Sequence, residues 1–256
     1  MSLSNALHKK IAIMQPTYLP WIGYFAMISQ ADVFVFLDSV EFSYRSWQRF
    51  NRIKTRQGIS KVSLSVNKKE VNHKAISEVK LSNTTDWRTK NLNLLKENYS
   101  KAPYYDEVIE LIATVFSENT ELLSALNIQI IKSVCNYMGL ETEGKFVLSS
   151  QLNAKGNKSA LLKDIVLELE GTEYISAKGS FEYIETEGIL TSTPFKLSFF
   201  DYNHPEYKQQ FGDFESHLSI LDLLFNHGKE SLDILNSGLK ENLSFEALKK
   251  IYNESN

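Results

Sequence analysis

Cysteine is nearly missing from this sequence, which has Cys135 alone among its 256 residues. One thiol cannot form a disulfide within the chain, so a disulfide-stabilised scaffold is excluded and a reducing compartment is expected. Cys135 ends the apolar run at residues 128–135, where a buried thiol is far commoner than a nucleophile. The protein must therefore be stabilised by packing its own core.

Long hydrophobic runs and a strong net charge are missing as well. No stretch reaches the ~18 to 20 apolar residues of a membrane-spanning helix, and residues 1–10 lack the apolar segment of a signal peptide. The net charge is −3 and the isoelectric point is about 6.0, so no overall basic field attracts nucleic acid. We expect a cytoplasmic protein without membrane insertion, and nucleic acid is not its expected partner.

The residues that are present suit a globular protein. Hydrophobic residues make up 43% and aromatic residues 12% of the chain, which is long enough to bury a core. Residues 10–14 and 33–37 are short apolar runs typical of buried strands. Between them, apolar residues recur at helical spacing from Trp21 to Ile28, directly after Pro20. This order predicts a parallel βαβ unit with a right-handed crossover.

Hydrophobic patterns further along the chain extend this arrangement. Strands are expected at residues 61–66, 146–148, 173–176 and 193–202, with residues 76–81 as a candidate partner of the first. Helices are expected at residues 86–99, from Pro103 onward, at 120–138 with Gly139 as the C-cap, at 158–169, at 218–225 and in a polar tail at about 231–256. The strand, helix and strand within residues 146–176 form a second candidate βαβ unit.

Together these elements predict an α/β fold. The expected sheet is open, mainly parallel and Rossmann-like, of a kind that HIGH-type nucleotidyltransferases also have. The helical patterns at about 85–140 form an insertion or cap on that sheet. No repeat at a fixed period, low-complexity run or linker divides the chain, so we expect a single domain over residues 1–256.

The loop at residues 15–24 is the most informative segment. It leads from a strand into a helix N-terminus, where unpaired amides and the helix dipole favour phosphate. Gln15 and Tyr18 are its candidate ligand contacts, and Gly23 would let a ligand approach the backbone. The layout resembles that of HIGH-type nucleotidyltransferases, although both histidines of that motif are missing and Tyr24 follows the glycine. A rigid aromatic hinge that packs the helix on the sheet is the alternative.

A second segment begins at Asp38 and combines this carboxylate with aromatic and basic side chains. Asp38 follows the second strand, so we expect it beside Gln15 at the carboxyl edge of the sheet. If the run is helical, Arg45, Arg49 and Arg52 share one face and suit phosphate or carboxylate recognition. The candidate ligand-binding side chains are Tyr44, Arg45, Arg49, Asn51 and Lys54. A solvated basic face, or a surface that stacks RNA bases, is the alternative.

Two later segments carry further candidate polar groups. Lys178 and Ser180 lie at a predicted strand-to-helix turn, where they could meet an anion or merely cap the helix. His204 follows a predicted strand and suits proton transfer near neutral pH, although a histidine in a turn is more often structural. No histidine has zinc-ligand spacing, so we predict no metal site. The supporting polar residues are Tyr207, Ser219, Asp222 and Asn226.

Four motifs, spread over most of the chain, together point to a known family. They are Gln15-Pro16-x-Tyr18-x-Pro20-Trp21-x-Gly23-Tyr24-Phe25, Asp38 with Arg45-Ser46-Trp47 and the segment 49–54, His204-Pro205-x-Tyr207-x-Gln209, and Leu218-Ser219-Ile220-x-Asp222-Leu223-Leu224-Phe225-Asn226-x-Gly228. They resemble the WbqC-like family of bacterial proteins, and the similarity runs from Lys10 to about Lys229. The segment around Lys178 and Gly179 follows the family's Ser-Gly pattern only loosely.

This resemblance implies a context more than a reaction. Family members are associated with surface-polysaccharide and O-antigen pathways, often beside aminotransferases for nucleotide-linked amino sugars, and some are described as glycine or acyl transferases. The expected function is therefore the transfer of an acyl or aminoacyl group, such as glycine, to a nucleotide-linked amino sugar. A HIGH-like nucleotidyltransferase and a non-catalytic binding protein of the polysaccharide machinery are the alternatives.

The transferase hypothesis gives each candidate residue a role, although the family supplies no established catalytic residue. Phosphate is expected to bind to Arg45, Arg49 and Lys54, the substrate is oriented by Gln15 and Tyr18, and the general base is His204 or Asp38. The expected partner is a small anionic molecule, a nucleotide sugar. The cofactor stays open between a nucleotide and an acyl or aminoacyl donor, and Mg²⁺ is expected only for nucleotidyl transfer.

Overall fold

The chain forms an α/β structure around one six-stranded sheet. The computed structural model describes residues 8–118 and 120–255, so the segment 1–7, which carries part of the cytoplasmic expectation, lies outside the described residues. The strands are β1 (Lys10–Met14), β2 (Val33–Phe36), β5 (Phe146–Leu148), β6 (Glu173–Ala177), β7 (Lys196–Phe200) and β8 (Leu243–Ser244). All neighbouring pairs are parallel except β7 and β8, which confirms the mainly parallel sheet.

The strand order is β5-β2-β1-β6-β7-β8, with β1 near the middle. From β1 the chain moves outward to β2 and β5, and it then returns to the other side of β1 for β6 and β7. The direction of winding therefore switches between β1 and β6, and in open parallel sheets such a switch leaves a crevice at the carboxyl ends of the strands. The predicted unit at residues 146–176 is parallel as expected, but β5 and β6 are not neighbours.

Helices cover both faces of the sheet, and each face has its own core. On one face α1 (Ile22–Gln30), α4 (Leu123–Met138), α7 (Ile220–His227) and α8 (Ser231–Ser237) pack over the first core. On the other face α5 (Lys158–Glu168), α6 (Phe181–Glu187) and α9 (Phe245–Ser255) pack over the second. Along β1 the two faces alternate residue by residue, with Ala12 in the first core and Ile11 and Ile13 in the second.

The sides on which the helices lie follow from the handedness of the crossovers. The connection through α1 and the connection through α5 move in opposite directions along the sheet. Because parallel crossovers are nearly always right-handed, opposite directions require opposite faces. As this rule requires, α1 packs in the first core and α5 packs in the second core, on the opposite face of the sheet.

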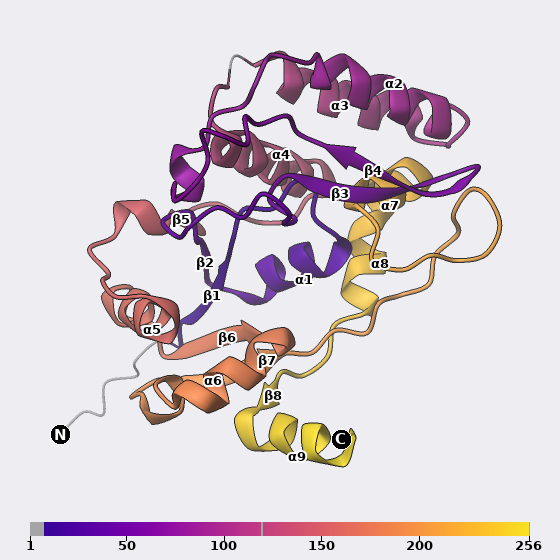
Figure 1. Cartoon of the computed structure of the whole chain (residues 1–256). Coiled ribbons are helices and arrows are strands. Elements are labelled where there is room, and N and C mark those ends of the chain that lie inside the picture. The colour runs from indigo at the N-terminus through magenta and orange to yellow at the C-terminus, as the bar shows by residue number, and fades with distance from the viewer. Residues whose placement is uncertain (1–7, 119, 256) are drawn as a thin grey trace.

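A large insertion separates β2 from β5. It contains the antiparallel hairpin of β3 (Phe50–Thr55) and β4 (Gly58–Ser63), the short 3₁₀ helix η1 (Ile76–Glu78), and the helices α2 (Trp87–Tyr99), α3 (Tyr105–Ser117) and α4. Figure 1 shows α2 and α3 at the top of the molecule, with the hairpin between them and the sheet. The predicted helical insertion is confirmed, and Gly139 caps α4 with a φ of 76°.

Two local predictions in this insertion are wrong. Residues 45–52 are not helical, because residues 44–49 form turns and a bend, and β3 begins at Phe50. The cause is the tight turn between Thr55 and Gly58, whose φ of 106° suits glycine and folds β4 back onto β3. Residues 76–81 are also not a strand, since residues 76–78 form η1 and the pairing with the segment 61–66 is limited to the bridge between Leu81 and Val66.

The C-terminal segment is more than a polar helical tail. It forms α8 and α9 as expected, but β8 lies between them and pairs with β7. Figure 1 shows α9 at the far end of the molecule from α2 and α3. Within the described part of the chain, no helix combines the length and hydrophobicity needed to cross a membrane.

Candidate functional site

Two adjoining cavities lie at the carboxyl ends of β1, β6 and β7. The first, which we call the Arg52 cavity, measures about 350 Å³ and is lined by Met14, Thr17, Pro20, Trp21, Tyr24, Trp47, Asn51, Arg52 and His217. The second, the Lys178 cavity, measures about 300 Å³ and is lined by Met14, Trp21, Gly23, Tyr24, Met27, Ala177, Lys178, Gly179, Phe200 and Tyr202. Met14, Trp21 and Tyr24 line both, so one wall separates the two spaces.

Two buried asparagines of the insertion hold the loop after β1 in place by hydrogen bonds. Asn51 Nδ2 donates to the carbonyls of Tyr18 and Leu19 at 3.1 and 2.7 Å. Asn127, fully buried on α4, donates to the Pro16 carbonyl at 3.0 Å. Prolines 16 and 20 prevent regular pairing here, so the free carbonyls need such side-chain donors. The loop is thus held rigidly, and Leu19 keeps a left-handed φ of 46°.

Gln15 and Tyr18, predicted to orient a substrate, take part in this bonding. Gln15 Oε1 accepts from Gln48 Nε2 at 2.8 Å, and the Gln15 carbonyl accepts from the Tyr24 hydroxyl at 3.0 Å. The Tyr18 hydroxyl is buried and accepts from Asn91 Nδ2 at 2.9 Å. Burial raises the pKa of Tyr18, which keeps this phenol neutral. Both residues support the loop beneath the cavities, and neither is among the cavity-lining residues.

The indole of Trp21 is the shared wall between the cavities. It lies over Gly23, since a β-carbon built on Gly23 would come within 2.1 Å of indole Cη2. Only glycine leaves room for the ring in this position. The ring therefore covers the N-terminal end of α1, where the sequence suggested a phosphate-binding loop.

Two histidines stack on the same indole. The His217 ring lies 4.8 Å from the ring of Trp21, and the His204 ring lies 5.9 Å from it. The backbone N–H of His217 donates to His204 Nε2 at 3.1 Å, and His204 Nδ1 lies 2.9 Å from the Pro205 carbonyl. Burial lowers the pKa of His204, so its imidazole is neutral at neutral pH.

Arg52 is a cation without a carboxylate partner. Its guanidinium donates to the His217 carbonyl at 3.3 Å and lies 5.5 Å from the centre of the Trp47 ring. Its Nε is buried and has no hydrogen-bond partner among the described residues. No ion pair found within the described residues includes this arginine. Arg52 therefore brings an uncompensated positive charge to the wall of an otherwise largely apolar cavity.

The other predicted cations are engaged elsewhere or exposed. Arg49 donates to the carbonyls of Tyr44 and Leu64, both at 3.1 Å, and lies over the Tyr44 ring. Arg45 is exposed in the preceding turn. Lys54 is 4% exposed and donates to Gln209 Oε1 at 3.1 Å and to the Asp213 carbonyl. None of them is among the residues that line the Arg52 cavity.

On the other side of Trp21, Lys178 faces the Lys178 cavity but already has a counter-ion. Its ammonium forms an ion pair with Asp201. Ser180 does not cap the following helix; its hydroxyl donates to the Ala177 carbonyl at 2.5 Å and bonds to Ser176 at 2.7 Å. The Lys178 cavity therefore carries little net charge.

Asp38 is buried where β2 ends, next to the segment that follows β5. It is 2% exposed, and its carboxylate accepts from the Ser149 hydroxyl and from the backbone and hydroxyl of Ser150 at 2.8 to 3.1 Å. Three donors satisfy a carboxylate well and hold the two segments together. Asp38 does not line either of the two cavities.

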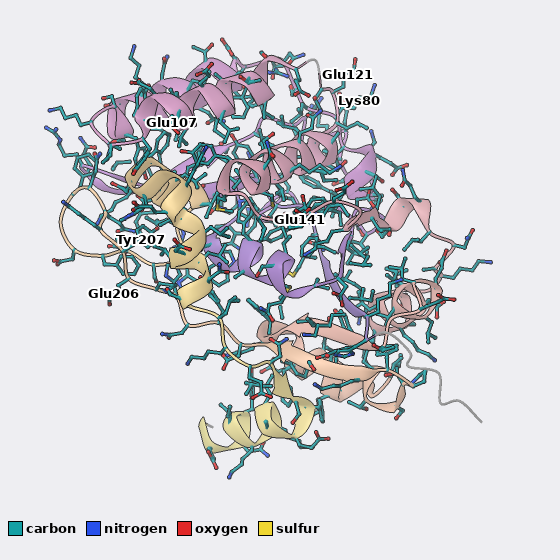
Figure 2. All side chains as sticks on the ribbon, turned by 180° about the vertical axis from the view of Figure 1, so that it is seen from behind. Lys80, Glu107, Glu121, Glu141, Glu206 and Tyr207 are labelled. Carbon is teal, nitrogen blue, oxygen red and sulfur yellow. The ribbon has the colours of Figure 1, made fainter. Side chains whose placement is uncertain are left out.

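A separate buried network lies behind the Arg52 cavity. Asp222 accepts from the Tyr99 hydroxyl at 2.8 Å, and its Oδ2 is buried without a hydrogen bond among the described atoms. Burial raises the pKa of Asp222, and the charge of Asp222 in turn adds to the rise in the pKa of Tyr207 that burial causes. Figure 2 shows Tyr207 beside α7 and α8, and its ring lies 5.7 Å from that of His227. These groups anchor the loop that carries His204.

The remaining supporting residues belong to α7. Ser219 caps this helix by accepting from the Leu221 backbone at 3.3 Å, and its own N–H donates to the Arg52 carbonyl at 2.8 Å. Asn226 donates to the Asp222 carbonyl one turn earlier at 2.7 Å. Ser219 thus ties the backbone of Arg52 to α7. Within the described residues no group of three or more His, Cys, Asp or Glu side chains is arranged to hold a metal ion.

The fold and this pair of cavities define an α/β protein with a small-molecule-sized crevice at the carboxyl edge of a mainly parallel sheet. The chain belongs to the WbqC-like protein family, whose model matches residues 15–234. It is 34% identical over 229 residues to Uncharacterized protein Rv1507c of Mycobacterium tuberculosis, an alignment that covers 89% of this chain and 97% of that protein. No solved structure matches the chain.

The sequence did not single out the residues that line the Arg52 cavity most prominently. His217 lacks metal-ligand spacing, and the motifs that contain Trp21 and Trp47 assign them no ligand contact. A signal for His217 is its place between the mainly polar segment 212–216 and the apolar run that forms α7. Arg52 was a member of the basic cluster, but only the folded structure separates it from Arg45 and Arg49.

Proposed function

We propose that this protein is a transferase that attaches an acyl or aminoacyl group, such as glycine, to a nucleotide-linked amino sugar for surface polysaccharide. The surface-polysaccharide context is what the resemblance to the WbqC-like family implies, and the Arg52 cavity supports the chemical part of the proposal. The observation that carries the proposal is Arg52 itself, a cation on the wall of an aromatic cavity with no carboxylate partner among the described residues.

A partly buried charge without a partner is costly for a protein to keep. The missing hydrogen bond at Arg52 Nε adds to that cost, because a buried unsatisfied donor loses ~1 to 3 kcal/mol. A phosphate or carboxylate in the cavity would supply the missing negative charge and would accept hydrogen bonds from the guanidinium. An anionic ligand would therefore balance the charge of Arg52, which no carboxylate among the described residues balances.

Aromatic side chains beside Arg52 suit the uncharged part of such a ligand. Trp47 is 47% exposed, which is unusual for so large an apolar side chain, and it lines the cavity together with Trp21. Indole faces stack on nucleobases and on the apolar faces of sugars. The volume of about 350 Å³ lies within the ~300 to 1,000 Å³ typical of small-molecule sites.

The adjoining Lys178 cavity supports a reaction between two molecules. Group transfer requires donor and acceptor side by side, and the two cavities share Met14, Trp21 and Tyr24. Because Asp201 neutralises Lys178, the second cavity favours an uncharged group such as the acyl part of a donor. The switch in strand order between β1 and β6 supports the proposal of a Rossmann-like sheet, whose ligands bind at this edge.

His204 and Asp38 stay proposals for the general base. Asp38 accepts three hydrogen bonds within the fold, and both ring nitrogens of His204 have protein partners. Either residue would have to exchange a partner before it could accept a proton from a substrate. The phosphate-binding role proposed for Arg45, Arg49 and Lys54 would likewise require a movement toward the Arg52 cavity.

A ligand screen by thermal shift tests the proposal. The panel holds UDP, dTDP, GDP and CMP, each free and linked to an amino sugar, with coenzyme A thioesters and adenosine as a neutral control. A ligand at ~100 times its dissociation constant adds ~2.7 kcal/mol to the free energy of unfolding, a shift that is easily measured. We expect a nucleotide to raise the melting temperature and adenosine to leave it unchanged. Equal responses to all, or to none, would reject the nucleotide-linked substrate.

A further inference from the structure

His204 and His217 contact the same indole, but their ring nitrogens differ in availability. His204 Nε2 accepts the backbone N–H of His217 at 3.1 Å, which requires an unprotonated Nε2. The proton of neutral His204 therefore sits on Nδ1, which donates to the Pro205 carbonyl at 2.9 Å. Both nitrogens are occupied, so His204 presents no free lone pair to a ligand.

His217, in contrast to His204, has a hydrogen-bond partner at only one of its two ring nitrogens among the described residues. Its Nδ1 lies 2.8 Å from the Ser216 hydroxyl, and its Nε2 has no hydrogen bond among the described residues. The side chain is exposed and lines the Arg52 cavity. With the proton on Nδ1 donated to Ser216, the lone pair of Nε2 is free to meet a ligand.

The backbone of His217 is held in an unusual conformation. Its φ is 57°, a left-handed value that is uncommon for residues with side chains. Here His204 accepts its N–H and Arg52 donates to its carbonyl. Two side chains of the site thus hold this residue through its N–H and its carbonyl, and such constrained residues cluster at functional sites.

The charges around His217 favour the neutral imidazole. Partial burial of the ring lowers the pKa of His217, and the Arg52 guanidinium lowers it further. The other titratable group in contact with it, His204, is itself neutral at neutral pH because burial lowers its pKa. A base must be unprotonated before the reaction, and His217 meets this condition.

We infer that His217, and not His204, is the proton-accepting residue of this site, and that His204 and Ser216 are positioning residues for it. The inference deepens the proposed function and rests on it for the reaction. In that reaction the amine nitrogen of the sugar attacks the carbonyl carbon of an acyl thioester. A C–N bond forms, the C–S bond breaks, Nε2 takes the proton from the nitrogen, and the proton then passes to the departing thiolate.

Histidine modification tests the availability of Nε2 without a known substrate. Diethyl pyrocarbonate acylates unprotonated, unpaired imidazole nitrogens, and peptide mass mapping gives the rate at each histidine of the whole chain. Exposed His73 serves as an internal reference. We expect His217 to react at least about tenfold faster than His204, because the reagent must first break a hydrogen bond at His204. Equal rates, or faster reaction of His204, would overturn the inference.

A second arm with UDP separates this inference from the proposed function. At a UDP concentration that occupies about nine-tenths of the protein, we expect modification of His217 to slow about tenfold while that of His73 is unchanged. If UDP shifts the melting temperature but does not protect His217, the histidine does not face the ligand and the inference fails. If His217 reacts quickly but UDP neither shifts the melting temperature nor slows the modification, the nucleotide-linked substrate is rejected. The availability of His217 Nε2 is then still supported.

A Ser216→Ala variant tests the positioning role. Without the Ser216 hydroxyl, Nδ1 of His217 loses its hydrogen-bond partner, and we expect the titration of His217, followed by NMR of ¹³C-labelled histidine, to move while that of His204 stays in place. The same variant should keep the melting temperature of the wild type, since Ser216 is exposed. An unchanged titration of His217 would contradict the role of Ser216.

Discussion

The indole of Trp21 lies so close over Gly23 that a β-carbon on the glycine would come within 2.1 Å of ring atom Cη2. This contact fixes the wall between the two cavities, because Trp21 lines both of them. It also explains the glycine of the N-terminal motif. The glycine is needed for the packing of a side chain, whereas the sequence suggested that it admits a ligand to the backbone.

A Gly23→Ala variant should therefore displace the indole. We expect a loss of about 1 to 3 kcal/mol in the free energy of unfolding, the usual cost of forcing an extra methyl group into a packed site, and a changed tryptophan fluorescence. Denaturant unfolding measures the first effect. Gly179→Ala is the matched control, since a β-carbon there meets nothing within 4 Å. Equal stabilities of both variants and the wild type would contradict the packing argument.

Asn127 holds the loop after β1 from beneath. Its amide donates to the carbonyls of Pro16 and Gln48 at 3.0 and 2.8 Å in a fully buried position. An Asn127→Leu variant would leave both carbonyls without a donor, so we expect a loss of about 2 to 4 kcal/mol, measured by denaturant unfolding.

Asn93→Leu is the control for that experiment, because Asn93 is exposed on α2. Its stability should stay within about 0.5 kcal/mol of the wild type. A similarly small loss for Asn127→Leu would mean that water replaces the missing donor and that the loop does not depend on this side chain.

Local hydrophobic patterns predicted the sheet well. The strand at residues 10–14 and the helical spacing after Pro20 are confirmed as β1 and α1, and Gly139 caps α4 as expected. These features depend on residues that are near one another in the chain. The helical interpretation of residues 45–52 failed because β3 is formed by pairing with β4, which is set by the turn at Gly58 and not by the arginine spacing.

The candidate site was harder to predict for the same physical reason. The Arg52 cavity joins the loop after β1, the hairpin and the loop before α7, which are brought together only by tertiary contacts such as the hydrogen bond from Ser219 to Arg52. Sequence spacing could not tell Arg52, which lacks a partner carboxylate, from Arg49, which bonds to two backbone carbonyls. Sequence spacing could also not show that the backbone N–H of His217 donates a hydrogen bond to His204 Nε2.

Acid should destabilise the fold partly through His204. Burial lowers its pKa below the usual value of about 6.5, so below that pH the unfolded chain binds more protons than the folded one. The stability that neutral His204 contributes is then present above about pH 6.5 and is lost as the pH falls through the lowered pKa. His217 acts in the same direction.

A His204→Gln variant should consequently lose less melting temperature between neutral and mildly acidic pH than the wild type does. His73→Gln is the control, since His73 lies on the surface beside Glu41. A His204→Gln curve parallel to that of the wild type over this range would show that His204 is not a half-buried, neutral imidazole.

The central claim is that Arg52 binds the anionic part of a ligand. Isothermal titration with UDP, on the wild type, Arg52→Met and Arg56→Met, tests it most directly. Arg56 lies in the turn of the same hairpin and does not line the Arg52 cavity. We expect Arg52→Met to weaken UDP binding about 10- to 150-fold, the worth of a charge-assisted hydrogen bond, and Arg56→Met to bind UDP as the wild type does. Equal affinity of all three proteins would contradict the role of Arg52 in anion binding.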